Sequence, residues 1–391
     1  MRNMVFMGLV SVILAVMIGC ATVPEQSAEA ETPVPTDYSG EPVLIQVKGA
    51  GLAPTGNGYF DTIEFQILAG KNYESEKWSI EIVDEKGSTA RKVSGTGAVP
   101  DLWSWDGLTD RKEKPADGRY RARLKVWFPD AREPIVQETA FFLLDTTGPV
   151  STIRFSEGLF SPDGDGSNDL LGINLNITDE LSPVASWTLE IFDSHGSEIK
   201  RFSSDEASEV SLTWDGTRSG VLMVDSASDY TAVLTSADRL GNVSRENAEF
   251  STDILVIREG TALRIRVNSI TFKAYTADFL DVDPEQRQSN LDTLDLLAAK
   301  LKRFPGYKIT LEGHAVSVFW DNPAKAEIEN RDVLMPLSAA RAEAIRIALQ
   351  ERGLDAAAMN IQPMGSSRPI VPFSDLQNRW KNRRVVFILT K

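Results

Sequence analysis

Alternating apolar and polar residues fill the chain from about residue 43 to residue 259. Residues 63–67 (I-E-F-Q-I) and 175–177 (L-N-I) are two such runs, and Gly, Asp and Asn residues separate them from the next runs. Alternation with a period of two is typical of β-strands that bury one face, and these residue types favour tight turns. Because helical periodicity is nearly missing here, the pattern predicts antiparallel β-sandwich structure.

The pattern changes at Thr261, where strand-like and helix-like segments begin to alternate. Apolar residues at helical spacing predict one helix that begins at Ser289, and a second that begins at Ser338 and ends at Gly353. Alternating residues predict strands at 263–267, 270–272, 307–314, 361–364 and 385–389. This order predicts an α+β domain at residues 260–391, with one sheet and its helices on one side.

The β-rich half of the chain repeats itself. The sequence W-S-I-E-I at Trp78 recurs as W-T-L-E-I at Trp187, 109 positions later. The W-D-G sequence at residues 105–107 recurs at residues 214–216 with the same offset. A near-constant offset between several landmarks indicates a tandem duplication.

In each copy a strand that begins D-G-x-Y or S-D-Y follows the W-D-G sequence. This combination resembles the immunoglobulin-like module of flagellar hook-capping proteins and many bacterial surface proteins. The resemblance implies two Ig-like sandwiches, module 1 at residues 43–148 and module 2 at residues 149–259. We expect the tryptophans to pack between the sheets rather than to stack on a ligand, because large aromatic side chains dominate such cores.

Module 2 contains an acidic loop, S-P-D-G-D-G-S-N-D, at residues 161–169. Alternating Asp and Gly allows several carboxylates to point at one centre, which is how Ca²⁺ is held in proteins. The candidate ligands are Asp163, Asp165, Asn168 and Asp169. The alternative is a tight turn whose Asp side chains accept from backbone amides. Module 1 has Thr55 and Asn57 at the equivalent positions and keeps only Asp61, so we expect the fold to form without the ion.

The N-terminus is typical of a signal peptide. Arg2 precedes an apolar run at residues 5–18 that is too short to span a bilayer. The run ends in M-I-G-C, and Cys20 is the only cysteine, so it has no disulfide partner. The segment resembles the lipobox of bacterial lipoproteins, which implies a signal peptide at residues 1–20, acylation of Cys20 and, because Ala21 follows it, an outer-membrane destination. An ordinary secretory signal with a chance cysteine is the alternative.

Residues 21–42 are rich in Pro, Glu, Ser, Thr and Ala, with isolated apolar residues only. Such a composition cannot bury enough surface to order itself, so we predict a flexible linker. The formal net charge of −15 argues against nucleic acid as a partner, because that binding depends on neutralising phosphates.

Composition and motifs also argue against catalysis. The chain has two histidines, His195 and His314, and one cysteine, which excludes the usual zinc and cysteine chemistries. It has neither a nucleophile elbow nor a phosphate-binding loop with Lys. His195 aligns with the turn at residues 84–87 of module 1, so we expect a turn residue there. The sequence predicts a non-enzymatic protein.

Three blocks of the C-terminal domain carry a family resemblance. They are L-E-G-H-A-V from Leu311, L-S-A-A-R-A from Leu337 and N-R-R-V from Asn382. In that order they resemble the OmpA-like domain that binds peptidoglycan in Gram-negative envelopes, over about residues 261–391.

The resemblance implies a site for the carboxylate and amine of diaminopimelate in the peptide stem of the wall. It assigns carboxylate binding to Arg341, beside the start of the second helix, because a guanidinium pairs bidentately with a carboxylate. It adds Arg383 as a site candidate, and His314 as a candidate whose side chain we expect to hydrogen-bond its loop. The alternative for Arg341 is a salt bridge to a neighbouring acidic residue.

Two positions depart from the family pattern. Val316 replaces the Asp that meets the ammonium of the ligand, and Leu334 replaces an Asn. The connection from residue 317 to residue 336 is about ten residues longer than usual, and Asp321, Asp332 or one of its Glu residues could substitute for the missing carboxylate.

The chain is therefore predicted to be a lipid-anchored outer-membrane protein that faces the periplasm. Its C-terminal domain would link the membrane to peptidoglycan through an altered diaminopimelate site. The alternative is a scaffold for other envelope proteins, or a surface adhesin, that uses the Ig-like modules and binds no peptidoglycan.

Overall fold

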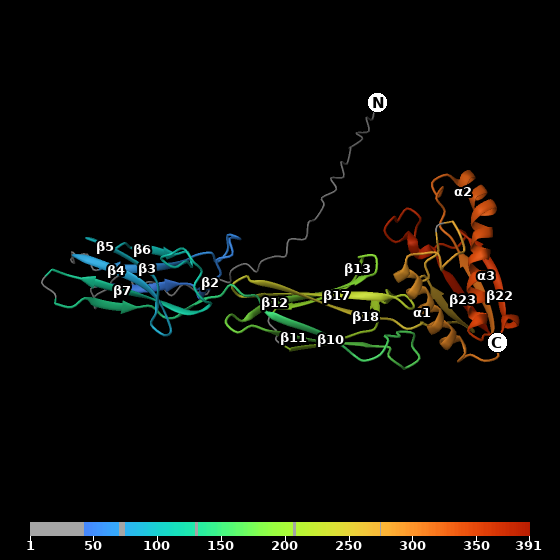
Figure 1. Ribbon diagram of the computed structural model, residues 1–391, viewed down its shortest axis with the longest axis horizontal. Helices are drawn as coiled ribbons and strands as arrows, with labels where there is room; N and C mark the ends of the chain where they lie inside the picture. The colour runs from blue at the N-terminus through green and yellow to red at the C-terminus, as the bar shows by residue number, and fades with distance from the viewer. Residues whose placement is uncertain (1–42, 70–74, 130–131, 206–208, 274) are drawn as a thin grey trace, which may run out of the picture. The chain divides into compact units, whose positions relative to one another are not determined.

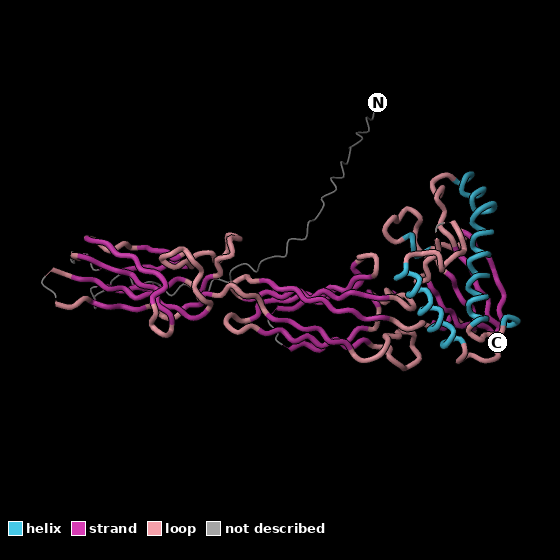
Figure 2. Tube along the Cα trace, in the orientation of Figure 1, coloured by secondary structure: helices cyan, strands magenta, loops and turns pink. Residues whose placement is uncertain are grey.

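The computed structural model describes residues 43–69, 75–129, 132–205, 209–273 and 275–391. The predicted signal peptide, Cys20 and the linker at residues 21–42 lie outside the described residues. Strands make up nearly all regular structure before residue 259, and the α-helices lie in the C-terminal part (Figures 1 and 2).

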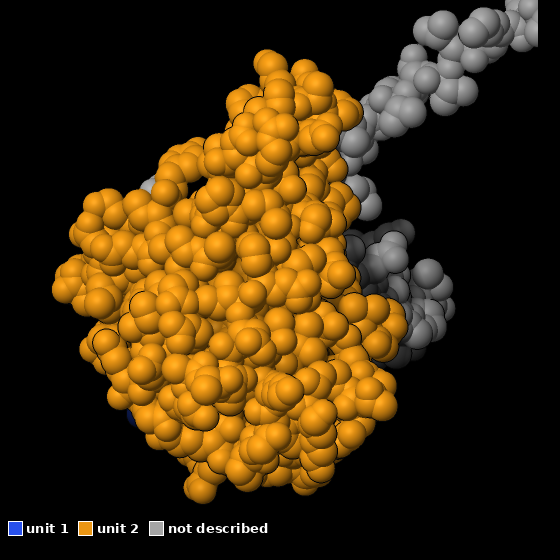
Figure 3. All heavy atoms as spheres, turned by 90° about the vertical axis from the view of Figure 1, so that its right-hand side faces the viewer, with its two compact units in different colours: residues 1–50, 56–115, 119–142 blue, residues 51–55, 116–118, 143–391 orange. Residues whose placement is uncertain are grey.

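The chain forms two compact units. Unit 1 consists of residues 56–115 and 119–142 and the described part of residues 1–50. Unit 2 consists of residues 51–55, 116–118 and 143–391. Figure 3 shows unit 2 in orange, seen from the side of the C-terminal domain.

Most of the first repeat lies in unit 1, whereas its residues 51–55, 116–118 and 143–148 belong to unit 2. One antiparallel sheet has the order β1 (Val43–Lys48), β3 (Ile63–Ala69) and β6 (Leu102–Trp105). A second sheet contains β5 (Thr89–Thr96), β4 (Lys77–Asp84), β7 (Gly118–Trp127) and β8 (Ile135–Glu138) in that order. Two short strands, β2 (Gly51–Leu52) and β9 (Phe142–Leu144), pair in parallel.

The second repeat, in unit 2, has the same strand order. Its first sheet contains β10 (Val150–Phe155), β11 (Leu171–Thr178) and β14 (Glu209–Trp214). Its second sheet contains β13 (Glu198–Asp205), β12 (Val184–Asp193), β17 (Asp229–Asp238) and β18 (Val243–Ser251). A small hairpin joins β15 (Thr217–Arg218) to β16 (Val221–Leu222). The predicted all-β architecture of this half is confirmed.

The two W-D-G sequences form the same turn. The indole nitrogen of Trp105 donates to the carbonyl of Leu108 at 2.8 Å, and that of Trp214 donates to the carbonyl of Thr217 at 2.8 Å. The glycine that follows has a left-handed φ of 73° in one copy and 75° in the other, a conformation that glycine adopts without strain. Both tryptophans are buried, as predicted.

The C-terminal domain has a five-stranded sheet of order β19-β20-β23-β21-β22. Its strands are β19 (Ile257–Glu259), β20 (Ala262–Val267), β21 (Lys308–His314), β22 (Met359–Gly365) and β23 (Val385–Thr390). Helices α1 (Pro284–Leu301) and α3 (Met335–Glu351) share one core with the sheet, and short 3₁₀ turns lie at η2 (Ala356–Ala358) and η3 (Arg379–Asn382). The predicted α+β architecture is confirmed. No described helix is long and apolar enough to cross a membrane.

The predicted start of the first helix and one predicted strand are wrong. Helix α1 begins at Pro284, so Ser289 lies inside it. Asp283 is the N-cap, because its carboxylate accepts from the amide of Gln286 at 3.0 Å, and proline suits the first helical position. Residues 270–272 form no strand.

The predicted start of the second helix is wrong as well. Helix α2 (Pro323–Glu329), the π-helical turn η1 (Asn330–Leu334) and α3 follow one another without a break. Ser338 therefore lies inside a helix. The helical run starts at Pro323, where the side chain of Asn322 accepts from the amide of Lys325 at 3.1 Å. The polar residues of this segment mask its helical character, whereas Asn322 followed by Pro323 is a helix start signal.

Candidate functional site

Gly313 brings helix α3 against strand β21. A Cβ atom at this position would lie 2.2 Å from the carbonyl oxygen of Ser338, closer than any real contact. The hydroxyl of Ser338 in turn accepts from the amide of Gly365, at the end of β22, at 3.1 Å. The G-H and L-S-A-A-R sequences thus pack closely against each other. Arg341 lies one helical turn after Ser338, which is at this contact.

Arg341 is buried at the wall of a cavity. Its Nε donates to the carbonyl of Thr276 at 3.0 Å, and its guanidinium carbon lies 4.9 Å from the centre of the Phe272 ring. Burial lowers the pKa of Arg341, and the charge of Arg383 lowers it further. Within the described residues no carboxylate pairs with Arg341, which argues against the salt-bridge alternative.

His314 is also buried, at the end of β21. Its main-chain amide donates to the carbonyl of Arg384 at 3.0 Å, whereas neither ring nitrogen has a hydrogen-bond partner among the described residues. The expected hydrogen bond from its side chain to the loop is therefore not formed. Burial lowers the pKa of His314 to about 3, with Arg384 and Arg368 contributing, so the ring is neutral at neutral pH.

The two arginines of N-R-R-V have different surroundings. Arg383 is exposed, whereas Arg384 is only 7% exposed. Arg384 donates from Nη2 to the carbonyl of Arg368 at 2.9 Å, and its Nε and Nη1 have no partner in the described structure. Burial lowers the pKa of Arg384 to about 10. Sequence reasoning chose Arg383 as the site candidate and missed its buried neighbour.

Val316 and Leu334 line the same cavity, so the two departures from the family pattern place apolar surface there. Neither acidic residue that was named as a substitute reaches this cavity. Asp332 forms a two-bond pair with Arg331, at 2.6 and 2.9 Å, and Asp321 is exposed.

Glu329, from the inserted helix α2, does line the cavity. Its Oε2 accepts from the hydroxyl of Ser317 at 2.6 Å and from the amides of Val318 and Phe319 at 3.1 and 3.3 Å. Its Oε1 accepts only from the amide of Val318, at 3.1 Å, among the bonds of the described residues. Oε1 of Glu329 can therefore accept a further hydrogen bond from a cationic group of a ligand.

The cavity has a volume of about 740 Å³ and is rich in positive charge. Four arginines line it, two of them largely buried, against two carboxylates, Asp229 and Glu329. The predicted site residues His314, Arg341 and Arg383 all belong to its wall, so the structure brings them together. A cavity of this size and charge suits an anionic ligand of small-peptide dimensions.

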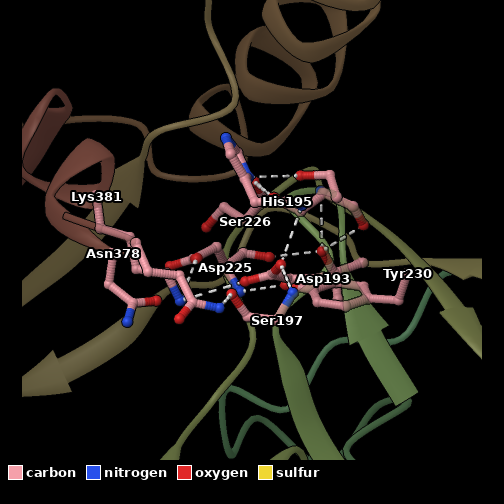
Figure 4. A network of polar contacts seen from close by, with 12 residues as sticks. Asp193, His195, Ser197, Asp225, Ser226, Tyr230, Asn378 and Lys381 are labelled. Atoms are coloured by element: carbon pink, nitrogen blue, oxygen red, sulfur yellow. Dashed lines mark hydrogen bonds and ion pairs between the residues drawn. The ribbon is translucent and has the colours of Figure 1, made fainter. Parts of the chain in front are cut away.

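Module 2 contributes to the wall of the cavity through the turn at His195. Figure 4 shows this turn with the polar network around Asp193 and Asp225. The His195 ring stacks on Trp380, with centroids 3.7 Å apart and planes at 13°. Lys381 lies 3.8 Å from Asp193 and 3.9 Å from Asp225. Burial lowers the pKa of His195 and raises that of Asp225. His195 is in a turn, as predicted, and in addition contacts the C-terminal domain.

The acidic loop of module 2 forms a tight turn. Asp169 accepts from the amides of Gly164 and Gly166, each at 2.7 Å. Module 1 builds the same turn around Asp61, which accepts from Gly56 and Gly58 at 2.7 Å. The turn therefore forms without the extra carboxylates.

The candidate calcium ligands of this loop lie partly together. Oxygen atoms of Asp163, Asp165 and Asp169 lie within 4.8 Å of one another. Asn168 has a left-handed φ of 55°, and burial raises the pKa of Asp163. Calcium binding at this loop stays a prediction.

Comparison with known proteins identifies the C-terminal domain as OmpA-like. The model of the OmpA family matches residues 281–383, and the β-rich region before it is unassigned. The chain is 33% identical over 112 residues to the peptidoglycan-associated lipoprotein of Agrobacterium fabrum, covering 28% of this chain and 58% of that protein. It is 29% identical over 150 residues to the peptidoglycan-associated lipoprotein of Rhizobium meliloti, covering 38% of this chain and 80% of that protein.

Among solved structures, the chain is similar to the periplasmic domain of Helicobacter pylori MotB (residues 90–256). The identity is 19% and the TM-score 0.28, over 35% of this chain and 78% of that one. The cell wall anchor of the type VI secretion system from Pseudomonas aeruginosa matches at 19% identity and a TM-score of 0.27, over 35% of this chain and 87% of that one.

Proposed function

We propose that the C-terminal domain binds the peptide stem of peptidoglycan in the arginine-lined cavity. The carrying observation is the buried guanidinium of Arg341, which lines the cavity and has no carboxylate partner among the described residues. A buried charge without a partner is strongly destabilising, and a carboxylate of the ligand would supply that partner. The Agrobacterium and Rhizobium relatives, which are named peptidoglycan-associated lipoproteins, support this ligand class.

Glu329 takes the part of the missing Asp in this proposal. Diaminopimelate carries an ammonium beside its carboxylate, and Val316 cannot pair with it. Glu329 lines the same cavity and has an incompletely used oxygen, so its carboxylate would receive the ammonium.

The proposed role of the whole protein is a non-catalytic link between the outer membrane and the wall. The lipid anchor would be Cys20, and the linker at residues 21–42 would separate the folded part from the membrane. The protein would face the periplasm, where peptidoglycan is found.

Sedimentation with purified sacculi tests the proposed function. The wild-type protein is expected in the pellet, and Arg341→Ala in the supernatant, because truncation removes the partner of the ligand carboxylate. Arg346→Ala is the matched control: it lies on the same helix and pairs with Glu343 at 2.6 Å. A wild-type protein that stays in the supernatant overturns the proposal.

A second candidate, a protein-interaction scaffold, is favoured by the surface of the inserted segment. Val318, Phe319, Trp320, Ile328 and Val333 are each more than 40% exposed. Several exposed apolar side chains within one short segment are typical of an interaction surface. Loss of an envelope-protein partner in Trp320→Ser, with sacculus binding unchanged, would assign this segment to a protein partner.

A further inference from the structure

We propose that the arginine-lined cavity has a saccharide subsite, in which Tyr275 stacks on the sugar that carries the peptide stem. The inference rests on the proposed function and adds the glycan to the ligand. Tyr275 lines the same cavity as Arg341, and its side chain is 77% exposed. A tyrosine ring that stays exposed at the wall of a cavity offers an apolar face and a polar tip to a ligand.

The backbone of Tyr275 is held in an unfavourable conformation. Its φ is 57°, in the left-handed region that residues with bulky side chains rarely adopt. The amide of Thr276 donates to the carbonyl of Lys273 at 3.1 Å, so the strained residue lies in a tight turn. Asparagine or glycine would fit this turn with less strain, so the turn itself gives no reason for a tyrosine. Strain of this kind is found at ligand sites, where it presents a side chain.

The same turn holds the guanidinium of Arg341. The carbonyl of Thr276, directly after Tyr275, accepts from Nε of Arg341 at 3.0 Å. The ring of Phe272, three residues before Tyr275, has its centre 4.9 Å from the guanidinium carbon. A ligand whose carboxylate pairs with Arg341 therefore has the Tyr275 turn beside it.

Hydroxyl groups make up much of the neutral polar wall of this cavity. Four serines line it, two from module 2 and two from the C-terminal domain: Ser194, Ser228, Ser269 and Ser289. A serine hydroxyl both donates and accepts, which matches the hydroxyl and N-acetyl groups of an amino sugar. The stack of His195 on Trp380, with centroids 3.7 Å apart, fixes the module 2 side of this wall next to Ser194.

The ligand of the proposed function contains such a sugar. In peptidoglycan the peptide stem that carries diaminopimelate is attached to N-acetylmuramic acid. The faces of a sugar ring are largely apolar and can pack on an aromatic ring, whereas its hydroxyl groups point outward to polar partners. The cavity volume of about 740 Å³ lies within the range of about 300–1,000 Å³ that is usual for small-molecule sites. It therefore has room for more of the ligand than one amino-acid residue.

Calorimetric titration of the full chain with two probes tests the subsite. The probes are the tripeptide alanyl-γ-glutamyl-diaminopimelate and the same tripeptide attached to N-acetylmuramic acid. The wild type is expected to bind the muramyl tripeptide at least about tenfold more tightly than the bare tripeptide.

Tyr275→Asn removes the ring, and asparagine adopts the left-handed conformation more readily. This variant is expected to bind the two probes equally, with the wild-type affinity for the bare tripeptide. An unchanged affinity for the bare tripeptide separates a sugar contact from an indirect effect on Arg341. Tyr275→Phe keeps the ring and should keep the preference for the muramyl tripeptide. Because the side chain is exposed, both variants are expected to fold, which circular dichroism checks.

Tyr59→Asn is the matched control, because this tyrosine is 58% exposed and belongs to unit 1. It should bind both probes as the wild type does. Equal affinity of the wild type for the two probes, or a preference that Tyr275→Asn keeps or Tyr275→Phe loses, overturns the stacking subsite and leaves the proposed function standing. Weaker binding of the bare tripeptide by Tyr275→Asn also overturns it, because Tyr275 would then act on the peptide. A wild type that binds neither probe overturns the proposed function together with the subsite.

Discussion

At the scale of single residues, two buried arginines of the cavity, Arg341 and Arg384, form no ion pair with a carboxylate within the part of the chain that the structure describes. Arg341 contacts the Phe272 ring and donates to one carbonyl, and two nitrogens of Arg384 have no hydrogen-bond partner among the described residues. A buried charge without a partner lowers the stability of the free protein, and a bound anion would compensate that charge. In the proposed function Glu329, which comes from the inserted helix α2, would receive the ammonium of the ligand in place of the Asp that the family resemblance implies.

The proposed role of Glu329 predicts a rescue by a second substitution. Glu329→Gln is expected to lower the affinity for a diaminopimelate-containing muropeptide by about one to two decades, because an unpaired ammonium costs about 1–3 kcal/mol. Adding Val316→Asp to Glu329→Gln should restore the affinity, as measured by calorimetry. Glu327→Gln, an exposed change in the same helix, should have no effect. Wild-type affinity in Glu329→Gln would contradict the assignment.

His314 predicts a dependence of stability on pH. Its pKa is about 3 in the folded protein and about 6.5 in the unfolded chain. Between these values the unfolded state binds the proton and the folded state does not. The free energy of unfolding therefore falls as the pH falls from about 6.5 to about 3, by up to about 1.4 kcal/mol per pH unit.

Urea denaturation at several pH values measures this effect. His314→Gln should show a shallower loss of stability over the same range than the wild type, because it has no group to protonate. Identical slopes for the two proteins would contradict the depressed pKa.

At the scale of elements, the contact of α3 with the sheet depends on the missing side chain of Gly313. Any Cβ would overlap the carbonyl of Ser338, so the helix would have to move away from β21. The continuous run of α2, η1 and α3 has a second contact near the sheet, at the η1 turn. There Asn330 accepts from the amide of Ser366 at 2.7 Å.

Gly313→Ala is expected to lower the free energy of unfolding by about 1–3 kcal/mol, because the added methyl group forces a backbone shift. Gly172→Ala is the control in another strand: its Cβ would lie 3.4 Å from the nearest atom, an ordinary contact. That variant should stay within about 0.5 kcal/mol of the wild type. Chemical denaturation measures both, and equal stability of Gly313→Ala and the wild type would contradict the close approach.

At the scale of the whole molecule, module 2 and the C-terminal domain form one compact unit. Polar and aromatic contacts join them, including the stack of His195 on Trp380 and the pair of Lys300 with Asp253 at 2.6 Å. The turn at His195 lines the cavity. A change in the contact between module 2 and the C-terminal domain would therefore alter one wall of the candidate site.

Trp380→Ala is expected to weaken the coupling between the two parts. It removes the aromatic stack, which contributes about 0.5–1.5 kcal/mol beyond the buried area. Calorimetric unfolding should then show a larger difference between the unfolding temperatures of module 2 and the C-terminal domain than in the wild type. Trp320→Ala, at a side chain that is 41% exposed, should leave the profile unchanged. An unchanged profile in Trp380→Ala would contradict the coupling.

The pattern of the amino-acid sequence was enough to predict the structural class of each half of the chain. Alternation over neighbouring residues is a local signal, so it predicted all-β structure for both repeats and most strands of the C-terminal sheet. The L-E-G-H-A-V, L-S-A-A-R-A and N-R-R-V blocks named His314, Arg341 and Arg383 as site candidates, and all three line one cavity. Their part in binding stays a prediction.

Which groups meet in space depends on the packing of distant segments, and this became known from the folded structure. The carboxylate of Glu329, the buried Arg384 and the contribution of module 2 to the cavity all arise from segments far apart in the sequence. Local patterns report which face of an element is apolar, but the burial and the partner of a charged group depend on what the rest of the chain packs against it.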